Sequence, residues 1–162
     1  QDGSVLSEAC GALRAITMGD DMRKDFSGAY EHVKTFVKLG AVPLLLEATR
    51  RSMDTAQCNV DAVSMVFLAL KQLAANDESV TMIVKGGGLD LIAQALQEFS
   101  QSAMICRTAV ALIRNISGND AFKTDLVGNG GLDLMLQAMS AHPEDASLQE
   151  HGAAAMAAMA LR

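Results

Sequence analysis

Gly87-Gly88-Leu89-Asp90-Leu91 is followed 43 residues later by Gly130-Gly131-Leu132-Asp133-Leu134, which repeats it without a change. The match extends outward in both directions, because residues 70–96 align at the same spacing with residues 113–139, and most of the differences are conservative. Self-similarity at a fixed period of about 20–50 residues is the sequence signature of stacked structural units. The chain is therefore predicted to be a repeat protein.

Each unit is predicted to contain three helices. A short helix begins at an Asx cap and covers about 77–85 in one unit and 120–127 in the next. A glycine cluster ends it, because glycine supplies the left-handed conformation that a helix C-cap needs. A second helix follows at about 89–99 and 132–141. The third helix, over about 103–117, is the longest and carries apolar residues at helical spacing. The predicted fold class is all-α.

The composition supports this class and limits the partners. Half of the 162 residues are hydrophobic, Trp is absent and there are only two prolines, which is typical of a folded helical chain. A net charge of −6 argues against broad nucleic-acid binding, which needs a cationic surface. No segment reaches the roughly 18 apolar residues of a membrane span, so no membrane partner is expected.

The cysteines bear on the cellular compartment. Cys10, Cys58 and Cys106 are odd in number, form no CxxC pair and lie within apolar helical patterns. We interpret them as reduced and mostly buried, as in a cytoplasmic or nuclear protein.

Both ends of the chain match the third helix of a unit. Residues 5–17 contain Ala12-Leu13-Arg14-Ala15-Ile16, which aligns with residues 112–116, and the final Ala160-Leu161-Arg162 is aligned with residues 112–114. Neither end resembles a polar capping repeat, so we expect a fragment of a longer array that self-associates through its apolar ends. One domain is predicted over residues 1–162, divided at 1–18, 19–75, 76–118 and 119–162.

A three-helix unit with a glycine hinge before its second helix resembles the armadillo repeat. The resemblance is carried by the two Gly-Gly-Leu motifs and by Leu112-Ile113-Arg114-Asn115-Ile116-Ser117, and it covers nearly the whole chain. It implies an α-solenoid, a right-handed superhelix of armadillo repeats, whose third helices line a concave surface that binds other proteins.

The first complete unit departs from this pattern, because it is about ten residues longer than the others. The extra length falls in residues 18–38, where Asp20-Asp21-Met22-Arg23-Lys24-Asp25-Phe26, followed by Ala29 and His32, is similar to a segment found in one branch of the family. We interpret this insertion as an elongated first helix with a solvated face. A lobe that docks a partner is the alternative.

The candidate site follows from the role of the third helices that the resemblance implies. Helical spacing puts Arg107, Arg114 and Asn115 on one face, and one column of this face is basic in all four units. The candidate partner-binding residues are Arg14, Leu68, Lys71, Gln72, Arg107, Arg114, Asn115 and Arg162. The column has two interpretations. Its cations stabilise the carboxyl ends of their helices, or they form a ladder for an acidic, extended partner.

Other kinds of site are not expected. The glycine clusters lack the Gly-Lys-Ser/Thr of a phosphate-binding loop. His32, His142 and His151 have no carboxylate or cysteine at ligand spacing. We therefore predict no catalytic residue, no metal and no cofactor.

Armadillo proteins that bind basic import signals use Trp and Asn on the third helix. This chain has Gly11, Leu68, Ala111 and Met159 at the Trp positions, so such binding is not expected. The predicted function is a non-catalytic scaffold in the cytoplasm or nucleus that binds a protein or peptide in the third-helix groove. The alternative is a structural spacer whose partners bind to missing flanks or to the 18–38 insertion.

Overall fold

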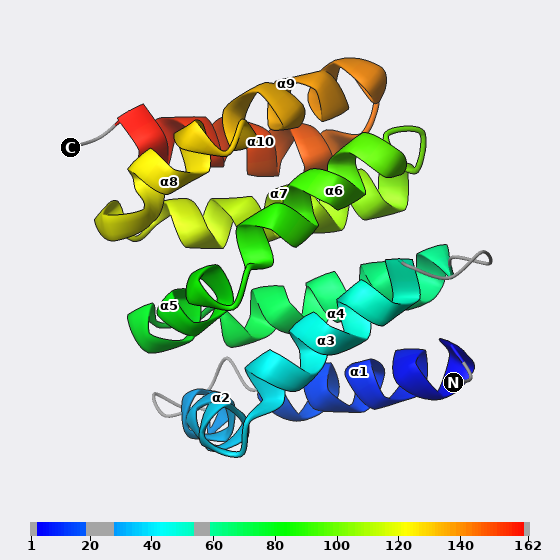
Figure 1. Ribbon diagram of the computed structural model, residues 1–162, viewed down its shortest axis with the longest axis vertical. Coiled ribbons are helices and arrows are strands. Elements are labelled where there is room, and N and C mark those ends of the chain that lie inside the picture. Colours follow the sequence, from blue (N-terminus) through cyan, green and yellow to red (C-terminus); the bar gives the residue numbers. More distant parts are fainter. Residues whose placement is uncertain (1–2, 19–27, 54–58, 161–162) are drawn as a thin grey trace.

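The computed structural model describes residues 3–18, 28–53 and 59–160, and every regular element in these ranges is helical. The elements are α1 (Gly3–Thr17), α2 (Ala29–Lys38), α3 (Ala41–Met53), α4 (Val60–Leu73), α5 (Asp77–Lys85), α6 (Gly88–Glu98), α7 (Ala103–Ser117), η1 (Asp120–Phe122), α8 (Lys123–Gly128), α9 (Gly131–Ala141) and α10 (Ala146–Ala160). Figure 1 shows them stacked in chain order along the longest axis of the molecule. The predicted all-α solenoid is confirmed.

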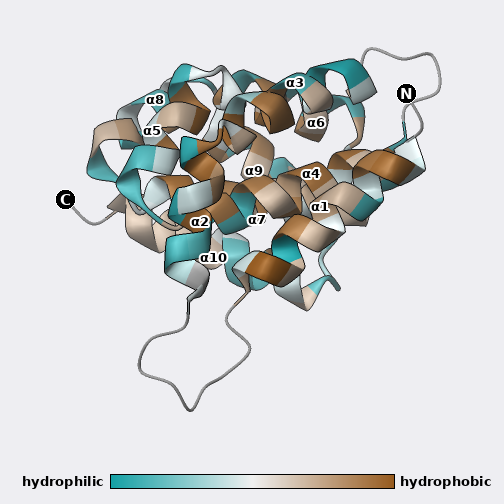
Figure 2. Ribbon diagram, turned by 90° about the horizontal axis from the view of Figure 1, so that it is seen from below, coloured by the Kyte–Doolittle hydropathy of each residue, from teal (hydrophilic) through white to brown (hydrophobic). Residues whose placement is uncertain are grey.

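The helices form two layers and an edge. The third helices of the units, α1, α4, α7 and α10, pack side by side in one layer. The second helices α3, α6 and α9 form the other layer, and the short helices α2, α5 and α8 lie along one edge (Figure 1). Hydrophobic positions gather between the layers (Figure 2), where Phe67, Leu112 and Ile116 are fully buried. Burial of these apolar faces stabilises the stack.

Three N-caps set the register of the third helices. The side chains of Asn59, Ser102 and Asp145 accept backbone hydrogen bonds from the residue three positions on, at 3.0, 3.4 and 3.0 Å. The caps are 43 residues apart, so α10 begins 43 residues after α7. The alignment of Ala160-Leu161-Arg162 with residues 112–114 is therefore wrong, because the cap places Ala157 at the position of Arg114. Arg162 itself lies outside the described residues.

A left-handed glycine precedes each helix of the second layer. Gly40, Gly87 and Gly130 have φ values of +84°, +83° and +72°, which residues with a side chain rarely adopt. The next residues, Gly88 and Gly131, pack closely on the short helices that precede them, α5 and α8. A Cβ on Gly88 would lie 2.7 Å from the carbonyl oxygen of Ile83. Glycine therefore both turns the chain and lets the first and second helices of a unit meet.

The first complete unit uses the same plan despite its length. Helix α2 begins after Gly28 and has ten residues, against nine in α5, so the helix is not elongated. The interpretation of residues 18–38 as an elongated first helix is wrong for residues 28–38, where the helix has an ordinary length. Residues 19–27, which hold most of its charges, lie outside the described residues.

Two cysteines lie in the core. Cys10 and Cys106 are free and buried, and burial raises the pKa of the Cys10 thiol to about 11. Cys58 lies outside the described residues. Among residues 3–18, 28–53 and 59–160, no helix is long and apolar enough to cross a membrane.

Candidate partner-binding groove

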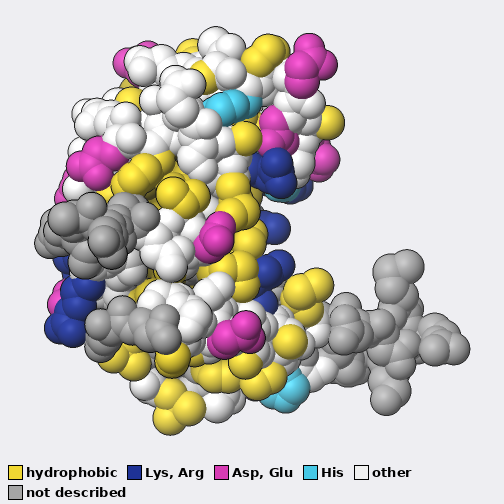
Figure 3. Space-filling view, turned by 90° about the vertical axis from the view of Figure 1, so that its right-hand side faces the viewer, with side chains coloured by type: hydrophobic (Ala, Val, Ile, Leu, Met, Phe, Trp, Pro, Cys, Tyr) yellow, Lys and Arg dark blue, Asp and Glu magenta, His cyan; other side chains and the backbone are white. Residues whose placement is uncertain are grey.

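The molecule is hollowed on the side of the third-helix layer. Figure 3 shows this hollow in profile, with Lys and Arg side chains projecting into it. The side-by-side packing of α1, α4, α7 and α10 places one face of each third helix along the hollow. We call the face that these four helices present to the hollow the third-helix groove.

Three cations of the predicted column come from successive third helices. Arg14, Lys71 and Arg114 each occupy the last turn of their helix, and all three are at least partly exposed. The Arg14 Nη1 atom lies 4.0 Å from the sulfur of Met65, and the Arg114 Nη1 atom lies 3.3 Å from Nδ1 of His151. None of the three forms a salt bridge with a carboxylate among the described residues.

Most other basic side chains in the described ranges have acidic partners. Lys34 pairs with Glu31 at 3.1 Å, and Arg51 pairs with Glu47 at 2.8 Å. Lys123 pairs with Asp120. The three cations of the column lack such partners, as do Lys38 and Lys85 at the ends of α2 and α5 among the described residues.

Arg107 differs from the other predicted cations, because it is neutralised. Its guanidinium donates to both oxygens of Asp145, with the shortest contact at 2.6 Å from Nη2 to Oδ2. The Asp145 side chain is only 12% exposed. The hydrogen bond from Arg107 lowers the pKa of Asp145, and the backbone amides of Leu148 and Ser147 lower it further. Arg107 thus links α7 to the cap of α10.

The predicted amides also contact the protein itself. The Asn115 Nδ2 atom donates to the carbonyl oxygen of Lys71 at 2.9 Å, and the Gln72 Nε2 atom donates to that of Thr17 at 3.0 Å. Each amide thereby satisfies a carbonyl at the carboxyl end of the preceding third helix. These two residues hold adjacent units together. Leu68 is half-buried on the same helix as Gln72.

His151 is a groove residue that sequence reasoning missed. It is half-buried on α10 beside Arg114, and its pKa is lowered by burial first and then by the positive charges of Lys71 and Arg114. Because a guanidinium can only donate, His151 Nδ1 must be the acceptor in this contact. Met65 faces Arg14 from α4, and His151 faces Arg114 from α10. The two residues are two periods of 43 residues apart, so they occupy equivalent positions in their helices. The 43-residue spacing of the N-caps was the signal that could have revealed it.

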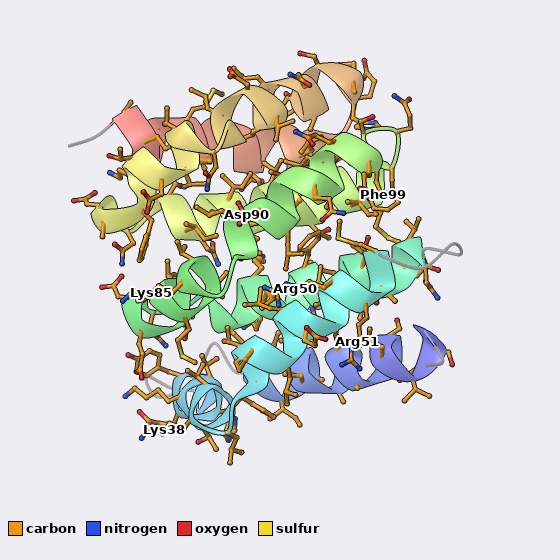
Figure 4. All side chains as sticks on the ribbon, in the orientation of Figure 1. Lys38, Arg50, Arg51, Lys85, Asp90 and Phe99 are labelled. Atoms are coloured by element: carbon orange, nitrogen blue, oxygen red, sulfur yellow. The ribbon has the colours of Figure 1, made fainter. Side chains whose placement is uncertain are left out.

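The opposite side of the molecule carries cations of a different kind. Arg50 pairs with Glu47 and also donates to the carbonyl of Gly86. Lys38 and Lys85 end α2 and α5 and are exposed at the edge of the stack, away from the third-helix layer (Figure 4). They provide a natural control for experiments on the groove.

The Asp145 contacts give a pH-dependent prediction. The pKa of Asp145 is lower in the folded state than the unfolded value of about 3.9. Its stabilisation is therefore present above that value and is lost as the pH falls through the folded pKa. Asp145→Asn keeps a cap acceptor and should destabilise less than Asp145→Ala, which loses about 0.5–2 kcal/mol from the cap alone. Urea unfolding near pH 7 and near pH 3 tests this.

The difference in stability between wild type and Asp145→Asn should shrink at the lower pH. A difference that is equal at both pH values would show that the carboxylate charge is not the source of the stabilisation.

The described residues contain no group of three or more His, Cys, Asp or Glu that could hold a metal ion.

Comparison with known proteins supports the repeat assignment. No family model matches the sequence. Armadillo repeat-containing protein 6 from Homo sapiens and from Pongo abelii is 33% identical to the chain over 101 residues, which is 62% of the chain but 19% of each relative. The crystal structure of an engineered protein from the Northeast Structural Genomics Consortium superposes with a TM-score of 0.79 and 22% identity, covering 99% of this chain and 58% of that one.

The structural match shows the fold, and the sequence match shows a similarity to an armadillo repeat-containing protein. The chain spans about a fifth of the curated relatives it matches, so the similarity concerns a segment of those proteins. The resemblance to armadillo repeats inferred from the glycine hinges and the third helix is confirmed. The chain is an α-solenoid that is similar over 101 residues to armadillo repeat-containing protein 6.

Proposed function

We propose that the chain is a non-catalytic interaction scaffold, in the cytoplasm or nucleus, and that its third-helix groove binds an extended, acidic segment of a partner protein. The observation that carries this proposal is the lack of acidic partners for Arg14, Lys71 and Arg114 among the described residues of a chain with a net charge of −6. In the same structure, Arg107 is neutralised by Asp145. The groove therefore presents positive charge that an acidic ligand can neutralise.

The geometry of the stack fits an extended ligand. Packed helices lie about 8–10 Å apart, and an extended chain advances about 3.3 Å per residue. The cations of α1, α4 and α7 would then meet a carboxylate at about every third residue of the ligand, over about six residues. Exposed ion pairs contribute about 0–1 kcal/mol each, so they set register and association rate. The half-buried Leu68 would supply an apolar contact.

The position of the cations in the last helical turn also fits a purely structural role. Each of Arg14, Lys71 and Arg114 lies where a cation interacts favourably with the helix dipole, which is worth about 0.3–1 kcal/mol. Both roles are compatible, because a cation at a helix end remains available to a ligand on its exposed side. A structural spacer with its binding sites elsewhere is the outcome if the ligand role fails.

Charge reversal in the groove tests the proposal. We expect Lys71→Glu with Arg114→Glu to weaken binding of a labelled peptide with Glu at every third residue by about tenfold or more. The matched control, Lys38→Glu with Lys85→Glu, changes the net charge equally at the edge of the stack and should leave the affinity nearly unchanged. Fluorescence anisotropy at two salt concentrations measures both, and salt should weaken the wild-type complex.

Three outcomes distinguish the alternatives. Loss of affinity confined to the groove variant supports binding in the groove. Equal loss in both variants would show a general effect of net charge. No binding by the wild type would favour the spacer function.

A further inference from the structure

One position in the groove combines two unneutralised cations with a titratable ring. Lys71 on α4 and Arg114 on α7 both act electrostatically on His151 of α10. The Arg114 Nη1 atom is 3.3 Å from His151 Nδ1, and this is the side-chain hydrogen bond recorded for Arg114 among the described residues. Arg114 therefore contacts the ring directly from the neighbouring helix, and Lys71 acts on it electrostatically from the helix before that.

The hydrogen bond fixes the protonation state of the ring. Arg114 donates, so His151 Nδ1 carries a lone pair and the proton resides on Nε2. A proton on Nδ1 would remove the acceptor and add a positive charge beside two others. Burial and the cations beside the ring favour the neutral form of His151 in the free site, because together they outweigh the opposing charge of Glu150.

The surroundings of the ring contain a single opposing charge. Lys71, Arg114 and Arg107 lower the pKa of His151, and burial lowers it most, whereas Glu150 on α10 raises it. Of these three cations, Arg107 is paired with Asp145, whereas Lys71 and Arg114 have no acidic partner among the described residues. An anion bound beside Lys71 and Arg114 would therefore offset two of the charges that lower the pKa of His151.

We propose that Lys71, Arg114 and His151 form a binding site for one anionic side chain of the partner segment, and that His151 takes up a proton from solvent when this anion binds. The inference rests on the proposed function of the groove and adds to it a specific anchor and a pH dependence. The bound anion offsets the charges of Lys71 and Arg114 and accepts a hydrogen bond from the imidazolium. A carboxylate and a phosphate monoester share this chemistry.

The expected signature is affinity that rises as the pH falls. Anion binding raises the pKa of His151, so between the free and bound values the affinity increases by up to about tenfold per pH unit. Glu side chains titrate near 4.3 and stay ionised above about pH 5.5, so a Glu peptide reports the histidine alone. Phosphoserine has a second pKa near 6 and loses charge in the same range.

The experiment compares two peptides that differ at one position, Glu or phosphoserine, within the Glu-spaced sequence used for the groove. NMR titration of the histidine rings gives the pKa of His151 in the free protein and with each peptide at saturation. His151→Gln identifies its signal and should abolish the pH dependence of Glu-peptide affinity between about pH 8 and 5.5.

His142→Gln is the matched control. His142 lies outside the column, with its Nε2 atom 2.8 Å from the carbonyl oxygen of Ser100, so its replacement should leave the pH dependence intact. If the pKa of His151 rises when either peptide binds, the site accepts anions in general. If it rises only with the Glu peptide, the site is specific for a carboxylate. If it rises only with the phosphoserine peptide, the site is specific for a phosphate.

Two results would overturn the inference, and they can be told apart. Peptide binding with no change in the pKa of His151 would refute the anion site while leaving the groove function standing. Failure of both peptides to bind the wild type would refute the groove function, and the anion site with it.

Discussion

Replacing Gly88 by alanine is expected to lower the free energy of unfolding by about 2–3 kcal/mol and the Tm by about 4–12 °C. An alanine within a helix is normally favoured over glycine by about 1 kcal/mol, so the expected sign is opposite to propensity. The reason is space, because the new Cβ would lie 2.6 Å from Ile83 Cγ2 and 2.7 Å from the Ile83 carbonyl oxygen. The backbone atom cannot move away without separating α5 from α6.

Gly128→Ala provides the matched control in the adjacent unit. Gly128 ends α8, has no positive φ, and a Cβ there would meet nothing within 4 Å. This substitution should leave stability unchanged or raise it slightly, by about 0.4–1 kcal/mol. Thermal unfolding followed by circular dichroism measures both variants. If Gly88→Ala were as stable as Gly128→Ala, the close contact between the first and second helices would not be a requirement of the repeat.

The second large effect concerns the face of the stack formed by α1, α2 and α3. Leu44 on α3 is 70% exposed, whereas Leu91 and Leu134, at the same place after their glycine hinges, are 5% and 9% exposed. These two leucines lie on α6 and α9, each of which packs against the second helix of the preceding unit (Figure 1). Leu44 therefore leaves exposed a position that the two later units bury.

The third helices repeat this difference. Ile16 on α1 is 50% exposed, and its equivalents Leu73 on α4 and Ile116 on α7 are fully buried. The apolar side chains at this end form a face of the kind that repeats bury against one another. Exposed apolar surface of this kind promotes association.

We therefore expect the chain to self-associate, with a mass by light scattering that rises with concentration above the monomer value of 17.1 kDa. Leu44→Glu should return it to a monomer, because a carboxylate cannot be buried in an apolar contact without a large cost. Met104→Glu adds the same charge at a residue that is 40% exposed on α7, in the middle of the stack, and should not change the mass. A wild-type chain that is monomeric at every concentration would contradict this expectation.

The sequence predicted the architecture because its strongest signals are local. The Gly-Gly-Leu motifs mark two hinges directly, and the apolar spacing of the third helix marks the spine of the stack. The Gly40 hinge was harder to recognise, because Leu39-Gly40-Ala41 lacks the second glycine of the motif. Its role follows from a φ of +84°, which only the structure shows.

The candidate site was less predictable because it depends on contacts between units. The column of cations could be read from helical spacing, but the bond from Asn115 to the carbonyl of Lys71 joins residues 44 apart. The pairing of Arg107 with Asp145 spans 38 residues. The register of the last helix is hard to predict, because its Ala-rich sequence has no clear apolar face. The three residues at its end favour one alignment with α7, whereas the N-cap at Asp145 gives the alignment seen in the structure.

We propose that an acidic segment of a partner lies along the third-helix groove. The most direct test is an NMR titration of the labelled chain with the Glu-spaced peptide, following every backbone amide. We predict that the shifted amides lie on α1, α4, α7 and α10, near Arg14, Lys71 and Arg114, while those near Lys38 and Lys85 do not move. Shifts concentrated on α2 and α5, or within residues 18–38, would place the ligand outside the groove and contradict the claim.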